Sequence, residues 1–211
     1  MKLLIVDDHT LFRDGLALLM GLEFPQVELL QAGSLAQAQE TLARHPDTRL
    51  VLLDLGLPDA SGLDGLARLR SASDEVPCVV LSAEESPTVV LAALDAGAAG
   101  FIPKTTQSDT MLAALRTILA GGVYLPPCVT GEAVVPALVR EPLAGLSDRQ
   151  MDVLRLLVEG KSNKLICRDL GLSESTVKTH LSAIFRRLGV SSRTQAVVTA
   201  SRLGLRLELE P

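Results

Sequence analysis

The segment that most constrains this sequence is Leu50–Pro58, in which four apolar residues lead directly into an acid and then into turn residues. An unbroken apolar run of this length, bounded by Gly and Pro, is typical of a parallel strand buried on both faces. Asp54 would then stand at the carboxyl end of that strand, at the edge where open α/β sheets hold their ligands. We therefore expect other strands to bring further polar residues to the same edge.

The first 120 residues alternate short apolar runs with segments of helical periodicity. The expected strands are residues 3–6, 27–30, 50–54, 76–81 and 100–102. This alternation with short joints predicts an α/β fold, a parallel sheet covered by helices on both faces. The five-stranded, doubly wound (flavodoxin-like) order 2-1-3-4-5 places strands one and three side by side, where the chain reverses direction.

Local signals predict where several of the helices begin and end. Ser34 and Ser86 stand where N-cap residues are expected. In the first helix, Leu11 and Leu16 belong to the expected apolar face, and Gly21 is expected to end the helix.

Residues with phosphate or cation chemistry follow four of the five expected strands. They are Asp7 and Asp8 after the first, Asp54 at the end of the third, Ser82 at the end of the fourth, and Lys104 just past the fifth. One acid at a strand end is more often a helix cap or a turn former, so the interpretation depends on all of these residues sharing one rim. Three carboxylates close together repel one another unless a cation lies among them, and hard oxygen ligands suit Mg²⁺.

The same rim has the chemistry of phosphoryl transfer. A carboxylate can act as the nucleophile and form an aspartyl phosphate. Catalysis of such a transfer consists mostly of positioning and charge neutralisation, to which the Lys104 ammonium and the Ser82 hydroxyl can contribute. His9, beside the acidic pair, is more often a surface residue or a capping aid, and we leave it out of the predicted site.

A family resemblance covers residues 1–120. Its motifs are the acidic pair Asp7-Asp8, Asp54 followed by Leu57-Pro58 and Gly62, Ser82-Ala83, and Phe101 three residues before Lys104. With this set the segment resembles the receiver domain of a bacterial two-component response regulator. The resemblance implies that Asp54 accepts phosphate from a sensor histidine kinase and that Ser82 and Phe101 form a switch. It also implies an Mg²⁺ site formed by Asp8 directly, Asp7 largely through water, Asp54, and the carbonyl of Gly56.

Charge and composition divide the chain. Residues 1–120 carry 8 basic against 16 acidic side chains, whereas residues 141–211 carry 11 against 8. This asymmetry suits a cation-binding half and a half that approaches a polyanion, although differently solvated surfaces would give the same signal. Residues 121–146 are rich in Pro and Gly, which predicts a linker with a short helix or docking segment from Val134 to Val139. We therefore predict domains over 1–120 and 147–211.

The second domain is predicted to be an all-α bundle of four helices. Ser147 and Gln150 form a capping box, and Gly171 separates the second helix from a third that begins after Ser173. Two short helices joined by a Gly-containing turn are the helix-turn-helix arrangement, which places its second helix in the DNA major groove.

The outward face of that third helix carries candidate DNA contacts. The expected contacts, including flanking positions, are Lys161, Lys164, Thr176, Lys178, Thr179, Ser182, Arg186 and Arg193. Lys178 can address guanine acceptors and the Thr179 methyl can meet thymine, while Lys161, Lys164 and Arg193 suit phosphate. The pattern alone leaves open a four-helix interaction module with a solvated basic face.

A second family resemblance favours DNA binding. Its segments are residues 146–150, 160–164, 172–180, 188–190 and 192–196. They resemble the LuxR-type DNA-binding domain, and the whole chain is similar to the NarL/FixJ class of transcriptional response regulators. Gln150 and Leu165 stand where such domains commonly carry Glu, and Ser182 stands where some carry a basic residue that contacts bases. The resemblance therefore implies the docking mode more firmly than the identity of the bases that are recognised. The class implies double-stranded promoter DNA as a partner and a homodimer when phosphorylated.

Two other functions fit part of this pattern. A protein or small ligand could set the state of the first domain without phosphate. An aspartyl-phosphate phosphatase would need a general acid or base beside the nucleophile, and no strand end supplies one apart from the acids assigned to Mg²⁺. We therefore expect a phosphorylation-gated regulator and not an enzyme.

The cysteines and the apolar segments indicate the compartment. Cys78, Cys128 and Cys167 are odd in number and far apart, which is typical of reduced thiols in the cytoplasm. No segment reaches the roughly 20 apolar residues that a membrane span needs. We expect a cytoplasmic protein without a membrane partner.

Overall fold

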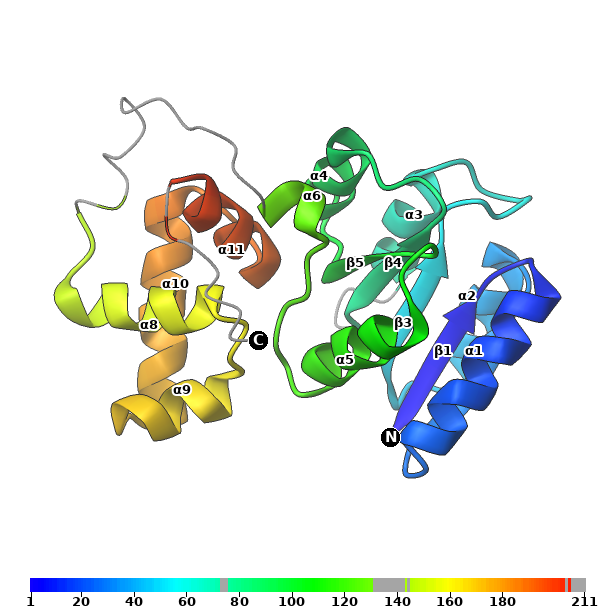
Figure 1. The fold of residues 1–211 in the computed structure, drawn as a ribbon, viewed down its shortest axis with the longest axis horizontal. Coiled ribbons are helices and arrows are strands. Elements are labelled where there is room, and N and C mark those ends of the chain that lie inside the picture. Colours follow the sequence, from blue (N-terminus) through cyan, green and yellow to red (C-terminus); the bar gives the residue numbers. More distant parts are fainter. Residues whose placement is uncertain (73–75, 131–142, 144, 204, 206–211) are drawn as a thin grey trace. The chain divides into compact units, whose positions relative to one another are not determined.

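The N-terminal part of the computed structural model is built on a parallel sheet, and the structure describes residues 1–72, 76–130, 143, 145–203 and 205. The strands are β1 (Lys2–Val6), β2 (Glu28–Ala32), β3 (Thr48–Asp54), β4 (Cys78–Ser82) and β5 (Gly100–Pro103). They pair in parallel in the order β2-β1-β3-β4-β5 (Figure 1). The predicted doubly wound order is therefore confirmed.

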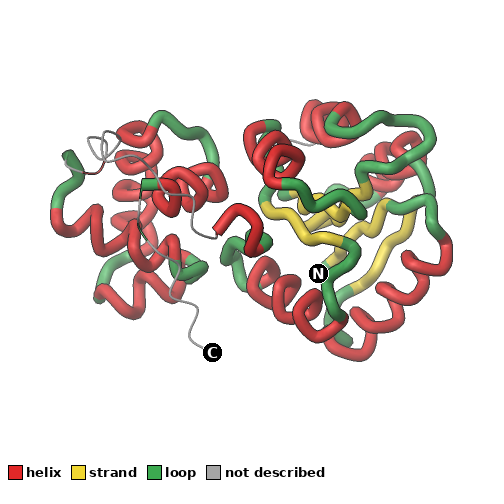
Figure 2. Tube along the Cα trace, turned by 45° about the horizontal axis from the view of Figure 1, so that its top comes forward, coloured by secondary structure: helices red, strands yellow, loops and turns green. Residues whose placement is uncertain are grey.

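Helices flank both faces of the sheet (Figure 2). They are α1 (Thr10–Glu23), α2 (Leu35–Arg44), α3 (Asp64–Ala72), α4 (Pro87–Asp95) and α5 (Ser108–Leu119). Residues Leu50–Asp54 of β3 are at most 4% exposed, and all five residues of β4 are buried. The apolar residues Leu50–Leu53 thus belong to a central strand that is covered on both sides.

Several predicted helix starts are confirmed by side-chain hydrogen bonds. The Ser34 hydroxyl accepts from the Gln37 amide, and the Ser86 hydroxyl accepts from the Val89 amide. At Ser147 both hydrogen bonds of the predicted capping box with Gln150 are present. These short-range contacts were readable because they join residues three positions apart.

Several local predictions were wrong, among them the fourth strand, which begins at Cys78 and not at Val76. The second strand is shifted to Glu28–Ala32, because pairing with β1 sets Lys2 opposite Glu28. Helix α1 continues past Gly21, which does not adopt the left-handed conformation that ends helices. Leu11 is 88% exposed, because it lies about 140° around the helix from Leu16, which faces the core.

In the C-terminal part, helices make up the regular structure of the described residues. Its helices are α6 (Pro127–Thr130), α8 (Asp148–Val158), α9 (Asn163–Leu170), α10 (Glu174–Leu188) and α11 (Arg193–Arg202). Helices α8, α9 and α11 each contact α10, so this domain has the predicted all-α core.

The chain divides into two compact units, Met1–Ala114 and Leu115–Pro211. The predicted bounds 1–120, 121–146 and 147–211 stay a prediction. The helix expected from Val134 to Val139 lies outside the described residues. Among the residues that are described, no helix has the length and apolarity to cross a membrane.

The loop after β3 is anchored to α2 by the Asp59 carboxylate. Asp59 Oδ1 accepts from the Leu35 amide and Oδ2 from the Ala36 amide, both at 2.9 Å. These hydrogen bonds satisfy orphan donors at the start of α2 and lower the pKa of Asp59 below its ordinary value of 3.8. The same loop contains Gly56 and follows Asp54, so this contact fixes one wall of the rim.

We expect Asp59→Ala to lower the free energy of unfolding by about 1 kcal/mol, because two helix N-terminal amides lose their partner. Since the folded-state pKa is lowered, this contribution is present above pH 3.8 and is lost as the pH falls below that value. Urea unfolding at several pH values measures the difference, with the exposed Asp14→Ala as control. A difference that stays constant down to pH 2 would contradict this role.

Candidate functional site

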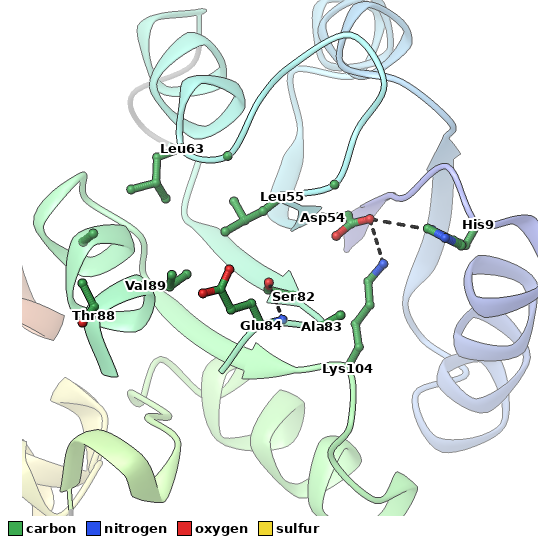
Figure 3. Close-up of a pocket in the computed structure, with 13 residues that line it drawn as sticks. His9, Asp54, Leu55, Leu63, Ser82, Ala83, Glu84, Thr88, Val89 and Lys104 are labelled. Atoms are coloured by element: carbon green, nitrogen blue, oxygen red, sulfur yellow. Dashed lines mark hydrogen bonds and ion pairs between the residues drawn. The ribbon is translucent and has the colours of Figure 1, made fainter. Parts of the chain in front are cut away.

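The sheet brings the predicted rim residues together. Asp7 follows β1, Asp54 ends β3, Ser82 ends β4 and Lys104 follows β5. Because these parallel strands are neighbours, their carboxyl ends meet at one edge. Asp54, Ser82 and Lys104 line one cavity of about 440 Å³ (Figure 3).

Two buried carboxylates share one ammonium group. Lys104 Nζ donates a hydrogen bond to Asp54 Oδ2 at 2.7 Å and forms an ion pair of poorer hydrogen-bond geometry with Asp7 Oδ2 at 2.8 Å. The Asp7 and Asp54 side chains are 0% and 4% exposed. Burial alone would lower the pKa of Lys104, but its interactions with the two carboxylates outweigh burial and raise it. Lys104 therefore stays charged at neutral pH.

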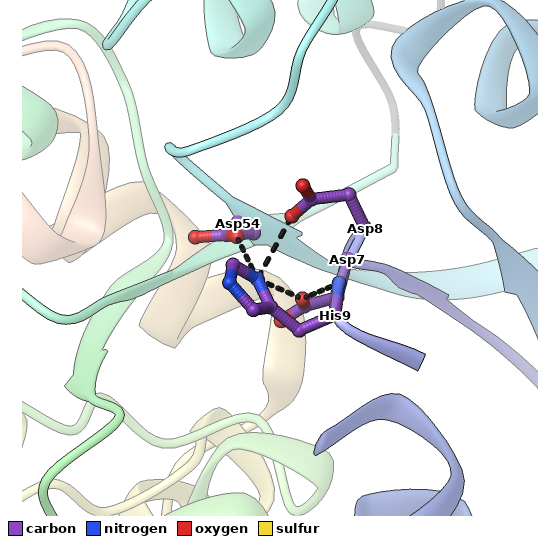
Figure 4. Close-up of side chains that lie close together, drawn as sticks. All are labelled: Asp7, Asp8, His9 and Asp54. Carbon is purple, nitrogen blue, oxygen red and sulfur yellow. Dashed lines mark hydrogen bonds and ion pairs between the residues drawn. The ribbon is translucent and has the colours of Figure 1, made fainter. Parts of the chain in front are cut away.

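Asp8 and His9 complete the acidic group (Figure 4). His9 Nδ1 lies 2.9 Å from Asp8 Oδ1 and 3.4 Å from Asp7 Oδ1. Ligand atoms of Asp7, Asp8, His9 and Asp54 all lie within 4.8 Å of one another. His9 was not among the predicted site residues, although its place directly after the acidic pair, at the N-cap of α1, was a signal for it.

The backbone at Gly56 approaches the Asp54 carboxylate closely. A Cβ at Gly56 would lie 3.4 Å from Asp54 Oδ2. That distance is an ordinary van der Waals contact, so Gly56 lies directly beside the Asp54 carboxylate. The metal-ligand role of the Gly56 carbonyl stays a prediction.

Two residues of α1 that the sequence analysis missed support the rim. Lys104 Nζ stands 5.0 Å from the centre of the Phe12 ring, within the range of a cation–π contact. Arg13 Nη1 donates to the Asp7 carbonyl at 2.5 Å, and Arg13 Nε donates to Gln31 Oε1 at 3.0 Å. Arg13 thus ties the end of β1 to β2. Such contacts join separate elements and leave no periodic signal in the sequence.

The two predicted switch residues lie in different surroundings. Ser82 is 6% exposed, and its Oγ accepts from the Glu84 amide at 3.1 Å. Phe101 is fully buried and pairs with Val80 across β4 and β5. The cavity beside Ser82 is lined by apolar side chains of α4 and of the loop before α3, including Leu63 and Val89. The switch role of both residues stays a prediction.

The C-terminal unit has helix-turn-helix geometry. Helix α9 ends at Gly171, which has a φ of 65°, and α10 begins after Ser173, whose hydroxyl accepts from the Thr176 amide. Val177 and Ile184 of α10 are fully buried. The α10 residues predicted to face DNA lie on the other side and are exposed: Lys178, Thr179, Ser182 and Arg186.

The flanking DNA candidates have different surroundings. Lys164 is exposed, and Thr176 is half-buried, with its Oγ1 2.7 Å from Ser173 Oγ. Lys161 Nζ forms ion pairs at 3.0 Å with both Glu159 and Asp169.

Arg193 is the most enclosed of these candidates. Its guanidinium donates to the Lys161 carbonyl and, at 3.1 Å, to Asn163 Oδ1. Burial lowers the pKa of Arg193 to about 10. Arg193 therefore joins the start of α11 to the start of α9, and any phosphate contact would have to share its donors with these bonds.

Both units match known protein families. Residues 3–116 match the family "Response regulator receiver domain", and residues 144–200 match "Bacterial regulatory proteins, luxR family". The chain is a LuxR-type response regulator. The NarL/FixJ class predicted from the sequence is confirmed, and the family consists of transcriptional regulators and not of enzymes.

Relatives match this response regulator over nearly its whole length. It is 39% identical over 208 residues to the glycerol metabolism activator of Pseudomonas putida, covering 94% of each chain. It is 34% identical over 200 residues to the nitrate/nitrite response regulator protein NarP of Escherichia coli, covering 93% of each chain. A LuxR family DNA-binding response regulator from Silicibacter pomeroyi is 33% identical, with a TM-score of 0.53 over 60% of this chain and 97% of that one.

Because the carboxylates are crowded, we expect the removal of one negative charge to stabilise the protein. With a chelator present at pH 8, Asp8→Asn should raise the free energy of unfolding by about 1 kcal/mol, because it removes one of three like charges a few ångströms apart. The amide oxygen of Asn can keep the His9 contact. Urea unfolding measures the change, and Asp14→Asn on the exposed face of α1 is the matched control. A loss of stability in Asp8→Asn would show that repulsion does not dominate the pocket.

Proposed function

We propose that a sensor histidine kinase phosphorylates Asp54 and that this modification controls promoter binding by the helix-turn-helix domain. One observation carries the proposal: the carboxylate of Asp54 lies at a cavity with the Lys104 ammonium 2.7 Å away and Ser82 on the neighbouring strand end. A nucleophile, a fixed positive charge and a hydroxyl donor thus surround one space. This is the arrangement that transfer of a phosphoryl group to a carboxylate requires.

The protein's own residues supply most of the chemistry. An Asp54 oxygen attacks phosphorus, the phosphorus bond to the kinase histidine breaks, and an acyl phosphate forms on Asp54. Lys104 leaves part of its interaction with Asp54 to meet a phosphoryl oxygen, while the Ser82 hydroxyl donates to another. Because these groups are already held at the rim, little reorganisation is needed at the moment of transfer.

The acidic group has the ligands of a divalent cation site. Within the described residues, carboxylates of Asp7, Asp8 and Asp54 converge, and two of them are buried beside a single Lys104. Their hard oxygen atoms fit Mg²⁺, which we propose is held by Asp8, Asp54, the Gly56 carbonyl and, through water, Asp7. When bound, the cation would neutralise charge that Lys104 alone leaves uncompensated.

The proposed output is a change in the face formed by α4 and β5. The phosphoryl group adds charge and strong acceptors beside Ser82, and the response would pass to Phe101 on the adjoining strand. We propose that phosphorylation releases or dimerises the helix-turn-helix units in the cytoplasm. A two-fold homodimer would then bind two half-sites on double-stranded promoter DNA.

On DNA, the exposed residues of α10 would do most of the sequence reading. Lys178, Thr179 and Ser182 would face base edges, and Arg186 would meet the backbone near the end of the helix. Lys164 and Thr176 would add contacts at the helix starts. Lys161 and Arg193 would contribute less, because both are engaged within the domain.

The phosphorylation proposal predicts a complete loss of response in Asp54→Asn. With a small phosphodonor and Mg²⁺, wild-type protein should gain one phosphoryl group and bind its site about 5- to 150-fold more tightly, the usual range of allosteric coupling. Intact-mass spectrometry and DNA-binding titrations measure the two effects. Asp64→Asn on the exposed start of α3 is the control and should respond like wild type. A wild-type protein that gains no phosphate would favour control by another ligand.

The helix-turn-helix proposal predicts different effects for base-facing and backbone-facing lysines. Lys178→Ala should cost about 1–3 kcal/mol on a site selected from random DNA and far less on unrelated DNA. Lys164→Ala should weaken binding to both and reduce the salt-dependence slope by about 1. Fluorescence anisotropy at several salt concentrations checks both, with Arg155→Ala on α8 as control. Equal losses on all sequences for Lys178→Ala would exclude base reading by that residue.

A further inference from the structure

The His9 ring closes one side of the acidic group. Its Nδ1 lies 2.9 Å from Asp8 Oδ1, 3.4 Å from Asp7 Oδ1 and 4.0 Å from Asp54 Oδ2 (Figure 4). One imidazole nitrogen thus faces all three carboxylates. The backbone amide of His9 also donates to Asp7 Oδ1 at 2.9 Å, which holds the backbone of His9 beside the pocket.

Helix capping does not account for this position. His9 is the N-cap residue of α1, yet its side chain makes no capping hydrogen bond. The ring is 67% exposed, so packing does not hold it over the carboxylates either. The contacts of Nδ1 all point toward the same group of oxygen atoms that would bind a cation.

An imidazole changes which cation such a group prefers. Carboxylate, carbonyl and water oxygens suit Mg²⁺, which binds nitrogen poorly, whereas imidazole is a good ligand for first-row transition metals. Neutral imidazole has one N–H and one lone pair, so Nδ1 can donate to Asp8 in one tautomer or ligate a metal in the other. Mn²⁺ belongs to this series and, like Mg²⁺, suits carboxylate, carbonyl and water ligands.

We infer that His9 is a nitrogen ligand of the divalent site and gives the phosphoacceptor pocket a preference for Mn²⁺ over Mg²⁺. The inference rests on the proposed cation site and extends it by naming a fourth side chain and the class of metal. His9 acts on the choice of cation and is assigned no part in the transfer of the phosphoryl group.

Metal binding to the full-length protein tests this directly. The electron paramagnetic resonance signal of free Mn²⁺ gives the Mn²⁺ affinity, and competition by Mg²⁺ gives the Mg²⁺ affinity. His9→Asn should lower the Mn²⁺ affinity about tenfold, the scale of losing one group that shapes a metal site, and leave the Mg²⁺ affinity within about twofold. Asn keeps a donor for Asp8, so a role limited to positioning Asp8 would survive the substitution.

A spectroscopic measurement separates ligation from proximity. Electron spin echo modulation of bound Mn²⁺ should show coupling to a directly bound nitrogen in wild type and lose it in His9→Asn. His45→Asn, which changes a histidine beside Lys2, is the control and should keep the coupling. Absence of nitrogen coupling in wild type, or an equal change in both metal affinities in His9→Asn, would overturn the inference.

Failure of this inference and failure of the proposed function give different results. If wild type and His9→Asn bind both metals alike and both accept phosphate on Asp54, only the role of His9 is wrong. If wild type binds neither metal and accepts no phosphate, the proposed site itself is wrong, and the assignment of His9 goes with it.

Discussion

The structure of the receiver depends on two carboxylates that are buried at one sheet edge and share one ammonium group. Removing Asp7 and Asp54 from water is costly, and the ion pairs to Lys104 offset only part of that cost. The sheet order brings the two acids together, because β1 and β3 lie side by side, Asp7 directly follows β1 and Asp54 ends β3. A cation that enters this pocket stabilises it by reducing its excess negative charge. An anionic group attached to the pocket adds to that charge and changes its interactions.

The surroundings of this pocket are fixed by contacts from elements on both sides. Arg13 holds the backbone of Asp7 from α1, and Phe12 lies against the Lys104 ammonium. Asp59 ties the loop after β3 to the start of α2. These contacts hold the acidic side of the rim, whereas the side toward α4 is a cavity with apolar lining. This difference suits the proposed phosphorylation of Asp54, because the apolar cavity leaves room for neighbouring side chains to change position.

The helix-turn-helix domain uses its charges in two ways. Lys161 and Arg193 connect α9, α11 and the end of α8 through ion pairs and hydrogen bonds. Lys178 forms an exposed pair with Glu174 at 2.9 Å, and such pairs contribute little stability. Lys178 can therefore exchange that partner for DNA at small cost, which agrees with the division of labour proposed for this domain.

The sequence by itself determined the parallel sheet, the place of Asp54 at a strand end, the caps at Ser34 and Ser147, and the turn at Gly171. Each of these is recorded by periodicity or by residues a few positions apart, since the backbone forces such neighbours together. Only the tertiary structure decided that the His9 ring turns toward Asp8, that Leu11 faces solvent, and that Arg193 bonds within its own domain. Those outcomes depend on which elements pack together, and a side chain's partners across elements leave no spacing in the chain to read.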